Sequence, residues 1–187
     1  MLFAMRKIIA AFNMTLDGTC DHTSGTPDAD LHQHYTDLML SSDALLYGRI
    51  TYGLMEYWKP SVYQPSGIQS MDDFAKGIDQ VRKIVFSNTL KEVDWASAEL
   101  ANANLEEVVQ NLKKEQGKPL LICSRSLIIQ LLNLELIDEL QLCIHPMVEG
   151  KGLEFFEKIH RRIYFNLLRT QVFKSGIVML CYGMKKG

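Results

Sequence analysis

The chain has 187 residues, a formal net charge of −2, and 47% apolar and 22% charged residues. These values are ordinary for one globular domain, so the composition argues against intrinsic disorder and fibrous repeats. Lysines and arginines are scattered along the sequence, which argues against nucleic-acid binding. No apolar run approaches the eighteen or so residues of a membrane span, and the first residues lack a signal-peptide pattern.

The four cysteines lack Cys-x-x-Cys spacing and are too sparse for a disulfide framework. A reducing compartment is therefore expected. We predict a cytoplasmic protein whose residues 1–187 form one domain.

Short apolar runs bounded by polar turns predict strands, and apolar residues three or four apart predict helices. Strands are predicted over residues 7–14, 44–47, 83–87, 120–123 and 139–148. Helices are predicted to begin near residues 27, 48, 70, 104 and 124. Residues 59–67 are predicted to be a surface loop, because they contain two prolines and a glycine.

The last third of the chain changes character. Residues 164–173 and 177–184 are apolar segments on either side of Lys174-Ser175-Gly176, which predicts a β-hairpin. The preceding βα alternation predicts parallel strands. We therefore expect a three-layer α/β/α fold with a mixed, mainly parallel central sheet and a C-terminal antiparallel hairpin.

Three strand-to-helix turns present small polar residues: Gly48 to Thr51, Ser87-Asn88, and Cys123 to Ser126. Helix N-termini attract phosphates, because their first amides are unpaired and the helix dipole is positive there. In an open α/β sheet, turns at the carboxyl ends of the strands line one crevice. A nucleotide or phosphate site is one interpretation, and helix capping alone is the other.

Several motifs follow one another in a characteristic order. They are Ile9-Ala10-Ala11, Thr15-Leu16-Asp17-Gly18, Gly48-Arg49-x-Thr51-Tyr52, Lys83-Ile84-Val85-Phe86-Ser87, Leu136-Ile137-Asp138-Glu139-Leu140, and Pro146-x-x-x-Gly150-x-Gly152-x-x-Phe155-Phe156. Together they resemble the dihydrofolate-reductase-like proteins over nearly the whole chain. The riboflavin-biosynthesis reductases are the closer match, because the loop after Gly18 lacks the Pro-Trp pair of true dihydrofolate reductases. In bifunctional proteins a zinc deaminase accompanies this reductase, but its H-x-E and P-C-x-x-C motifs are absent here.

The resemblance implies direct hydride transfer from NADPH to a small heterocycle or carbonyl, without flavin or metal. Gly48, Arg49 and Thr51 would receive the cofactor phosphates, and the Arg49 guanidinium suits the 2′-phosphate. The remaining implied contacts are Ser87 and Asn88 at the adenosine, Cys123, Ser124, Arg125 and Ser126 at the pyrophosphate, and Ala11, Leu16 and Asp17 at the nicotinamide. A surface salt bridge is the alternative interpretation of Arg49.

One departure from the family stands out. Cys123, Ser124 and Arg125 occupy positions where the family usually carries adjacent glycines that let the main chain approach the pyrophosphate. Their side chains could narrow the crevice, or Arg125 and Ser126 could supply charge-assisted contacts instead. A second hypothesis therefore stays open: a non-catalytic relative that serves as a ligand-binding or assembly module.

Asp28 and Asp30 are the candidate acids for protonating a substrate nitrogen, and Asp30 is preferred because it directly precedes Leu31 on the helix entering the core. Such an acid needs burial to raise its pKa. The alternative interpretation is a first-turn acid that stabilises the helix dipole. Thr26 is the expected cap of this helix, with Pro27 at its first position.

Three further expectations concern individual side chains and assembly. His32 and His34 are two apart on a helix and should point to different sides, so no metal site is assigned. Cys123 is expected to be a small buried hydrophobe rather than a nucleophile. Because related reductase domains usually pair, and the strands within residues 164–182 are apolar, a homodimer is expected.

Overall fold

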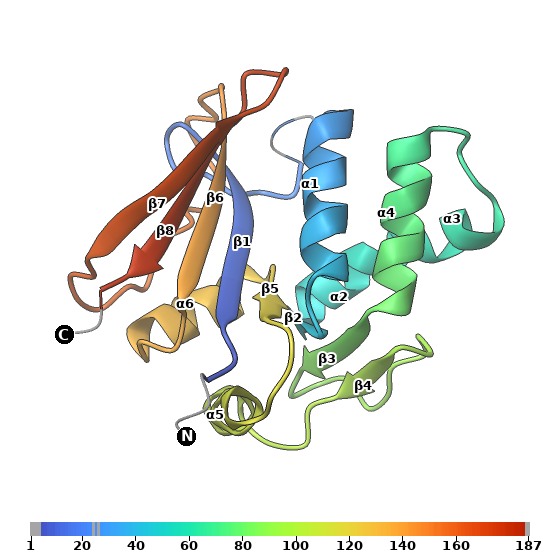
Figure 1. Cartoon of the computed structure of the whole chain (residues 1–187), viewed down its shortest axis with the longest axis horizontal. Coiled ribbons are helices and arrows are strands. Elements are labelled where there is room, and N and C mark those ends of the chain that lie inside the picture. Colours follow the sequence, from blue (N-terminus) through green and yellow to red (C-terminus); the bar gives the residue numbers. More distant parts are fainter. Residues whose placement is uncertain (1–4, 24, 26, 186–187) are drawn as a thin grey trace.

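The computed structural model describes residues 5–23, 25 and 27–185. Its elements are β1 (Ile8–Thr15), α1 (Ala29–Leu40), β2 (Ala44–Gly48), α2 (Arg49–Met55), the 3₁₀ helix η1 (Glu56–Trp58), α3 (Lys59–Tyr63), α4 (Gln69–Gln80), β3 (Arg82–Phe86), β4 (Ala98–Leu100), α5 (Leu105–Lys114), β5 (Leu120–Ile122), α6 (Arg125–Asn133), β6 (Glu139–His145), β7 (Phe165–Val172) and β8 (Val178–Met184) (Figure 1).

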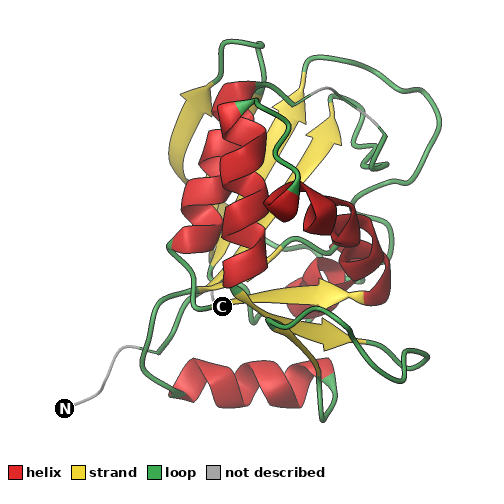
Figure 2. Cartoon of the chain, turned by 90° about the vertical axis from the view of Figure 1, so that its right-hand side faces the viewer, coloured by secondary structure: helices red, strands yellow, loops and turns green. Residues whose placement is uncertain are grey.

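Eight strands form one sheet in the order β4-β3-β2-β5-β1-β6-β8-β7. The strands from β4 to β6 are parallel, whereas β8 runs antiparallel to β6 and to β7. Figure 2 shows α1 and α4 upright in front of the strands, while α5 and α6 pack on the opposite face. The three-layer fold with a C-terminal hairpin is therefore confirmed.

The central strand β1 is buried on both faces. Ile8 and Ala10 belong to the core under α5 and α6, whereas Ile9 and Ala11 belong to the core under α1 and α4. Successive side chains of a strand point to opposite faces, so a strand covered by helices on both sides needs an unbroken apolar run. This explains the uniformly apolar start of β1.

Two predictions about secondary structure are wrong in detail. Residues 59–67 are not entirely a loop, because α3 occupies Lys59–Tyr63 with Pro60 in its first turn, where a missing backbone N–H does no harm. The short strand β4 falls between the predicted strand at residues 83–87 and the predicted helix near residue 104, where no strand was predicted. Only three residues long, it carries too little pattern to be seen in the sequence.

The start of α1 also differs from the prediction. Asp28 is the N-cap, and its Oδ1 accepts a hydrogen bond of 2.8 Å from the backbone N–H of Leu31. Pro27 therefore precedes the helix, and the predicted cap Thr26 lies outside the described residues. The predicted start of α5 near residue 104 is confirmed, since Asn104 is the N-cap and its side chain accepts from the N–H of Glu107 at 3.0 Å.

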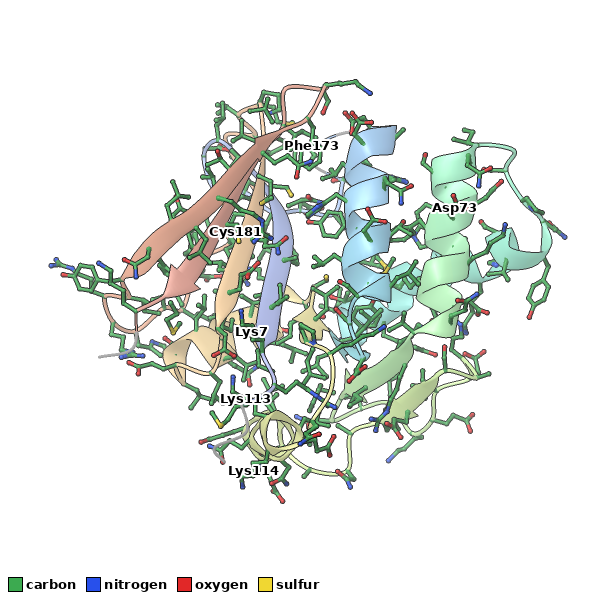
Figure 3. All side chains as sticks on the ribbon, in the orientation of Figure 1. Lys7, Asp73, Lys113, Lys114, Phe173 and Cys181 are labelled. Carbon is green, nitrogen blue, oxygen red and sulfur yellow. The ribbon has the colours of Figure 1, made fainter. Side chains whose placement is uncertain are left out.

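A buried ion pair ties α5 to the sheet. Figure 3 shows Lys113 on the side of α5 that faces the strands and Lys114 on the far side. The Lys113 ammonium is buried and bonds to the carboxylate of Asp138, whose Oδ2 also accepts a 2.9 Å hydrogen bond from the N–H of Ile8. One carboxylate thus joins α5, the start of β1 and the approach to β6.

Within the described residues, no helix has both the length and the apolar character needed to cross a membrane.

Candidate functional site

A pocket of about 430 Å³ lies where β2 and β3 end and α6 begins. Its lining residues are Gly48, Arg49, Ile50, Thr51, Phe86, Ser87, Asn88, Ala101, Ala103, Asn104, Leu105, Ser126, Leu127 and Gln130. Gly48, Arg49, Thr51, Ser87, Asn88 and Ser126 were predicted from the sequence to bind cofactor. They meet because the carboxyl ends of parallel strands lie at the same edge of the sheet.

Both apolar and polar side chains line the pocket. Phe86, Leu105 and Leu127 supply apolar surface, and Ala101 and Ala103 leave room beside it. Apolar surface beside polar groups that can orient a ligand is typical of small-molecule sites. The residues after β4 were missed from the sequence, because nothing there predicted a strand that would bring them beside β3.

Arg49 is exposed at this pocket. Its guanidinium makes no ion pair or hydrogen bond with any residue that the structure describes, so the surface salt bridge considered from the sequence finds no support. An unpaired guanidinium next to small hydroxyl side chains is suited to a phosphate, which it can bind through forked, charge-assisted hydrogen bonds.

The Ser87 side chain stabilises the turn after β3 through hydrogen bonds. Its hydroxyl oxygen accepts from the backbone N–H groups of Thr89 at 3.1 Å and Leu90 at 2.9 Å. The Ser87 hydroxyl also lies 3.4 Å from the Thr89 hydroxyl, where either oxygen can be the donor, so the Ser87 proton is available to a ligand when Thr89 is the donor. Ser87 can therefore both fix the turn and donate to a ligand.

Ser124 and Arg125, at two of the positions expected to be glycine, do not line the pocket. Ser124 is buried, and its Oγ accepts a 2.8 Å hydrogen bond from the N–H of Gly48. The Arg125 side chain turns away, because its Nε donates to the carbonyl oxygens of Glu154 at 2.8 Å and Phe155 at 3.2 Å. Of the predicted loop residues, only Ser126 faces the pocket.

Cys123 packs against the apolar core under α1 and α4. Burial, together with the neighbouring Cys143 thiol, raises the pKa of the Cys123 thiol to about 12. A thiol must ionise to act as a nucleophile. Cys123 is thus a small hydrophobe, as predicted.

The residues predicted to face a nicotinamide lie in the middle of β1 (Ala11) and in the loop after it (Leu16 and Asp17), outside the pocket. The β1–β5 ladder ends at Ala10 opposite Ile122, while the β1–β6 ladder continues to Thr15. Beyond Ala10, β1 therefore has no strand beside it on the β5 side, and Ala11 is the first residue at this gap. The side chain of Leu16, in the loop that follows β1, is 63% exposed.

Asp17 anchors this loop. Its carboxylate accepts from the hydroxyl of Thr15 and from the backbone N–H groups of Gly150 at 2.8 Å and Glu149 at 3.3 Å. These hydrogen bonds, that from Thr15 foremost, lower the pKa of Asp17. The Asp17 side chain thus has a local structural role. Only the main chain of Asp17 is left to contact a ligand.

The two candidate acids are engaged within the protein. Asp28 accepts from the N–H groups of Leu31 and of Ser175, the latter at 3.1 Å. Partial burial acts to raise the pKa of Asp28, but these hydrogen bonds outweigh it and the net pKa is lowered. Asp30 pairs with Lys174 at 3.2 Å, and its side chain is 38% exposed. In this conformation Asp28 lacks the burial-raised pKa expected of a general acid.

His32 and His34 point to different sides of α1, as predicted. The His32 ring contacts Trp58 and Phe74, whereas the His34 ring contacts Tyr35 and Phe173. Burial lowers the pKa of both imidazoles. Across the part of the chain that the structure describes, no group of three or more His, Cys, Asp or Glu side chains could hold a metal ion.

The sequence-family model of the RibD C-terminal domain matches residues 6–179 of the chain. The chain belongs to this family. This RibD C-terminal domain protein is 35% identical over 181 residues to the uncharacterised protein YyaP of Bacillus subtilis (strain 168), covering 95% of the chain and 94% of YyaP.

Two solved reductases share the fold. The riboflavin biosynthesis reductase Rib7 of Saccharomyces cerevisiae superposes with a TM-score of 0.62 at 16% identity, covering 99% of this chain and 92% of Rib7. Dihydrofolate reductase from Enterococcus faecalis, complexed with NADP(H) and RAB-propyl, superposes with a TM-score of 0.63 at 14% identity, covering 96% and 97% of the two chains. The resemblance to a dihydrofolate-reductase-like protein of the riboflavin-reductase type is thereby confirmed.

Proposed function

We propose that this RibD C-terminal domain protein is an NADPH-dependent reductase of a small heterocycle or carbonyl compound. The observation that carries the proposal is the pocket beside β2, β3 and α6, whose lining includes the unpaired Arg49 together with Thr51 and Ser126. The reductases that share the fold, one of them complexed with NADP(H), support the same conclusion.

The lining of the pocket fits the adenosine end of NADPH. The base would lie against the apolar surface of Phe86, Leu105 and Leu127, and the 2′-phosphate would accept hydrogen bonds from Arg49 and Ser87. Bound NADPH would supply the hydride. The backbone at Ala11 and the loop of Leu16 and Asp17 would orient its nicotinamide end.

Asp30 is the proposed source of the substrate's proton. The Asp30 carboxylate pairs with one exposed lysine, Lys174, whereas each oxygen of Asp28 accepts a hydrogen bond from a backbone N–H. An exposed ion pair contributes at most about 1 kcal/mol, so Asp30 can leave Lys174 when substrate approaches. Asp28 would have to uncap α1 to do the same, which costs typically about 1 kcal/mol in addition.

Arg49→Ala is expected to weaken NADPH binding by about 1.5–3 kcal/mol, the range for hydrogen bonds to charged groups, while hardly changing NADH binding. The contribution of Arg49 should shrink as salt rises, because the site is open to solvent. Isothermal titration with both cofactors measures the difference. Arg161→Ala is the matched control, since Arg161 pairs with Glu135 away from the pocket. Equal losses for NADPH and NADH would assign Arg49 a structural role.

A non-catalytic ligand-binding module is the second candidate. It is favoured by Arg125, which bonds to protein carbonyls and so supplies no pyrophosphate contact in place of the missing glycines. NADPH oxidation in the presence of pteridine, pyrimidine and quinone-like acceptors separates the two candidates. A steady rate that depends on an acceptor supports the reductase. NADPH binding without turnover on any of these acceptors supports the binding module.

The outer face of the C-terminal hairpin supports a homodimer. Leu167 and Val172 are 56% and 71% exposed on the edge strand β7, opposite Tyr182 and Val178 of β8. An exposed apolar edge of this kind is typical of an interface. Sedimentation at micromolar concentration should give a dimer for the native chain and a monomer for Leu167→Lys/Val172→Lys. Gln171→Lys, on the other face of β7, should remain dimeric, and a monomeric native chain would contradict the prediction.

A further inference from the structure

The loop that follows β1 is held by a second segment, residues 147–155, through main-chain hydrogen bonds. The N–H of Leu16 donates to Met147 at 2.9 Å, that of Cys20 to Leu153 at 2.8 Å, and that of Phe155 to Gly18 at 2.8 Å. Thr19 and Glu154 form a β-bridge. The loop and its supporting segment thus form one hydrogen-bonded unit.

The two segments also pack tightly. A side chain at Gly152 would bring its Cβ within 2.5 Å of Thr19 Cγ2, and Gly152 has a φ of +155°. Only glycine suits this position without displacement of the loop. Residues 152–155 and 18–20 are thus in direct contact as well as hydrogen-bonded.

Arg125 holds this unit to the start of α6. Its guanidinium donates to the carbonyl oxygens of Glu154 and Phe155 and pairs with the Glu157 carboxylate at 3.1 Å. The Arg125 side chain is only 14% exposed, whereas that of Glu157 is 52% exposed. The buried contacts to the two carbonyls should therefore contribute more than the partly exposed ion pair.

We propose that Arg125 is a positioning residue: it fixes the loop of residues 16–20 by donating hydrogen bonds to the carbonyl oxygens of Glu154 and Phe155. The proposal rests on the proposed function in one respect, since this loop is the one assigned to the nicotinamide. Arg125 acts on the cofactor through the loop rather than by binding its pyrophosphate. A planar guanidinium reaches both carbonyls and Glu157 at once, which a lysine ammonium could not do.

Amide hydrogen exchange of the protein without ligand tests directly whether these Arg125 hydrogen bonds stabilise the loop. Arg125→Ala should speed the exchange of the amides of Leu16, Cys20 and Phe155 by about tenfold or more, while the amides of β1 exchange as before, because only a local opening is affected. Arg125→Lys should restore little of the protection. Glu157→Gln is the matched control: it removes the ion pair, leaves both carbonyl contacts, and should exchange like the native chain.

NADPH binding separates the loop's role from a phosphate contact. The affinity of Arg125→Ala for NADPH and for 2′,5′-ADP should stay within about threefold of native, because the adenosine contacts are intact. The fluorescence of the bound nicotinamide should lose at least about half of its enhancement, because the loop no longer orders that end.

Unchanged amide exchange with about tenfold weaker NADPH binding would overturn the proposal and assign Arg125 to the pyrophosphate. If the native chain binds neither NADPH nor 2′,5′-ADP, the proposed function fails. The hydrogen-exchange result still decides whether Arg125 stabilises the loop.

Discussion

Asp138→Ala is expected to lower the free energy of unfolding by about 3–5 kcal/mol, the range for removing one partner of a buried ion pair. The carboxylate of Asp138 bonds to the buried ammonium of Lys113 and accepts from the N–H of Ile8. Without it, a buried charge is left uncompensated and the start of β1 loses a hydrogen bond. Urea denaturation followed by circular dichroism measures the loss.

A double-mutant cycle distinguishes the buried charge from general damage at this site. Lys113→Met removes the charge, and a pair replaced by apolar groups can be nearly neutral. Asp138→Ala should therefore destabilise a Lys113→Met background much less than the native chain. A loss below about 1 kcal/mol in the native background, or equal losses in the two backgrounds, would contradict this account of the pair.

Lys83 is expected to make stability rise with pH above about 8. Its side chain is fully buried, with the ammonium donating to the carbonyl of Val81 at 2.9 Å and the hydroxyl of Ser97 at 2.6 Å, and lying 4.2 Å from the centre of the Trp95 ring. Burial lowers the pKa of Lys83 from 10.5 to about 8, against the opposing effect of the Asp79 carboxylate.

The direction of this pH effect follows from proton binding in the two states. Below pH 8 Lys83 is protonated in both states, so it causes no pH dependence there. Between pH 8 and the unfolded pKa near 10.4, the unfolded chain binds more protons, so raising the pH favours the folded state. The stability of the native chain relative to Lys83→Met should rise by about 2 kcal/mol from about pH 7.5 to 9.5 in urea titrations. A flat or falling difference would show that the folded pKa of Lys83 is not depressed.

The layers of the fold and most of its helices and strands could be predicted from the sequence, because their patterns are long and consistent. The apolar run of β1 indicated a strand covered on both faces, and Gly48 to Thr51 indicated the turn at the pocket. The short strand β4 could not be predicted, and with it the residues at 101–105 that complete the pocket were missed. Three residues of strand are determined by their neighbour β3 rather than by their own pattern.

Other features of the site depended on which partner each polar side chain finds. The sequence left open whether Arg125 would turn toward a phosphate, and it turns instead to carbonyls some thirty residues further along the chain. It likewise did not indicate that the chain near Ser175 would come close enough to engage Asp28. Such partners are set by tertiary packing of distant segments, for which a single sequence carries no local signal.

Isothermal titration of the native chain with NADPH and with NADH tests the central claim most directly. The account predicts that NADPH binds and binds more tightly than NADH, because Arg49 and its neighbours provide donors for the 2′-phosphate. Absence of binding by either cofactor at millimolar concentration would contradict the claim that the pocket at β2, β3 and α6 is a cofactor site.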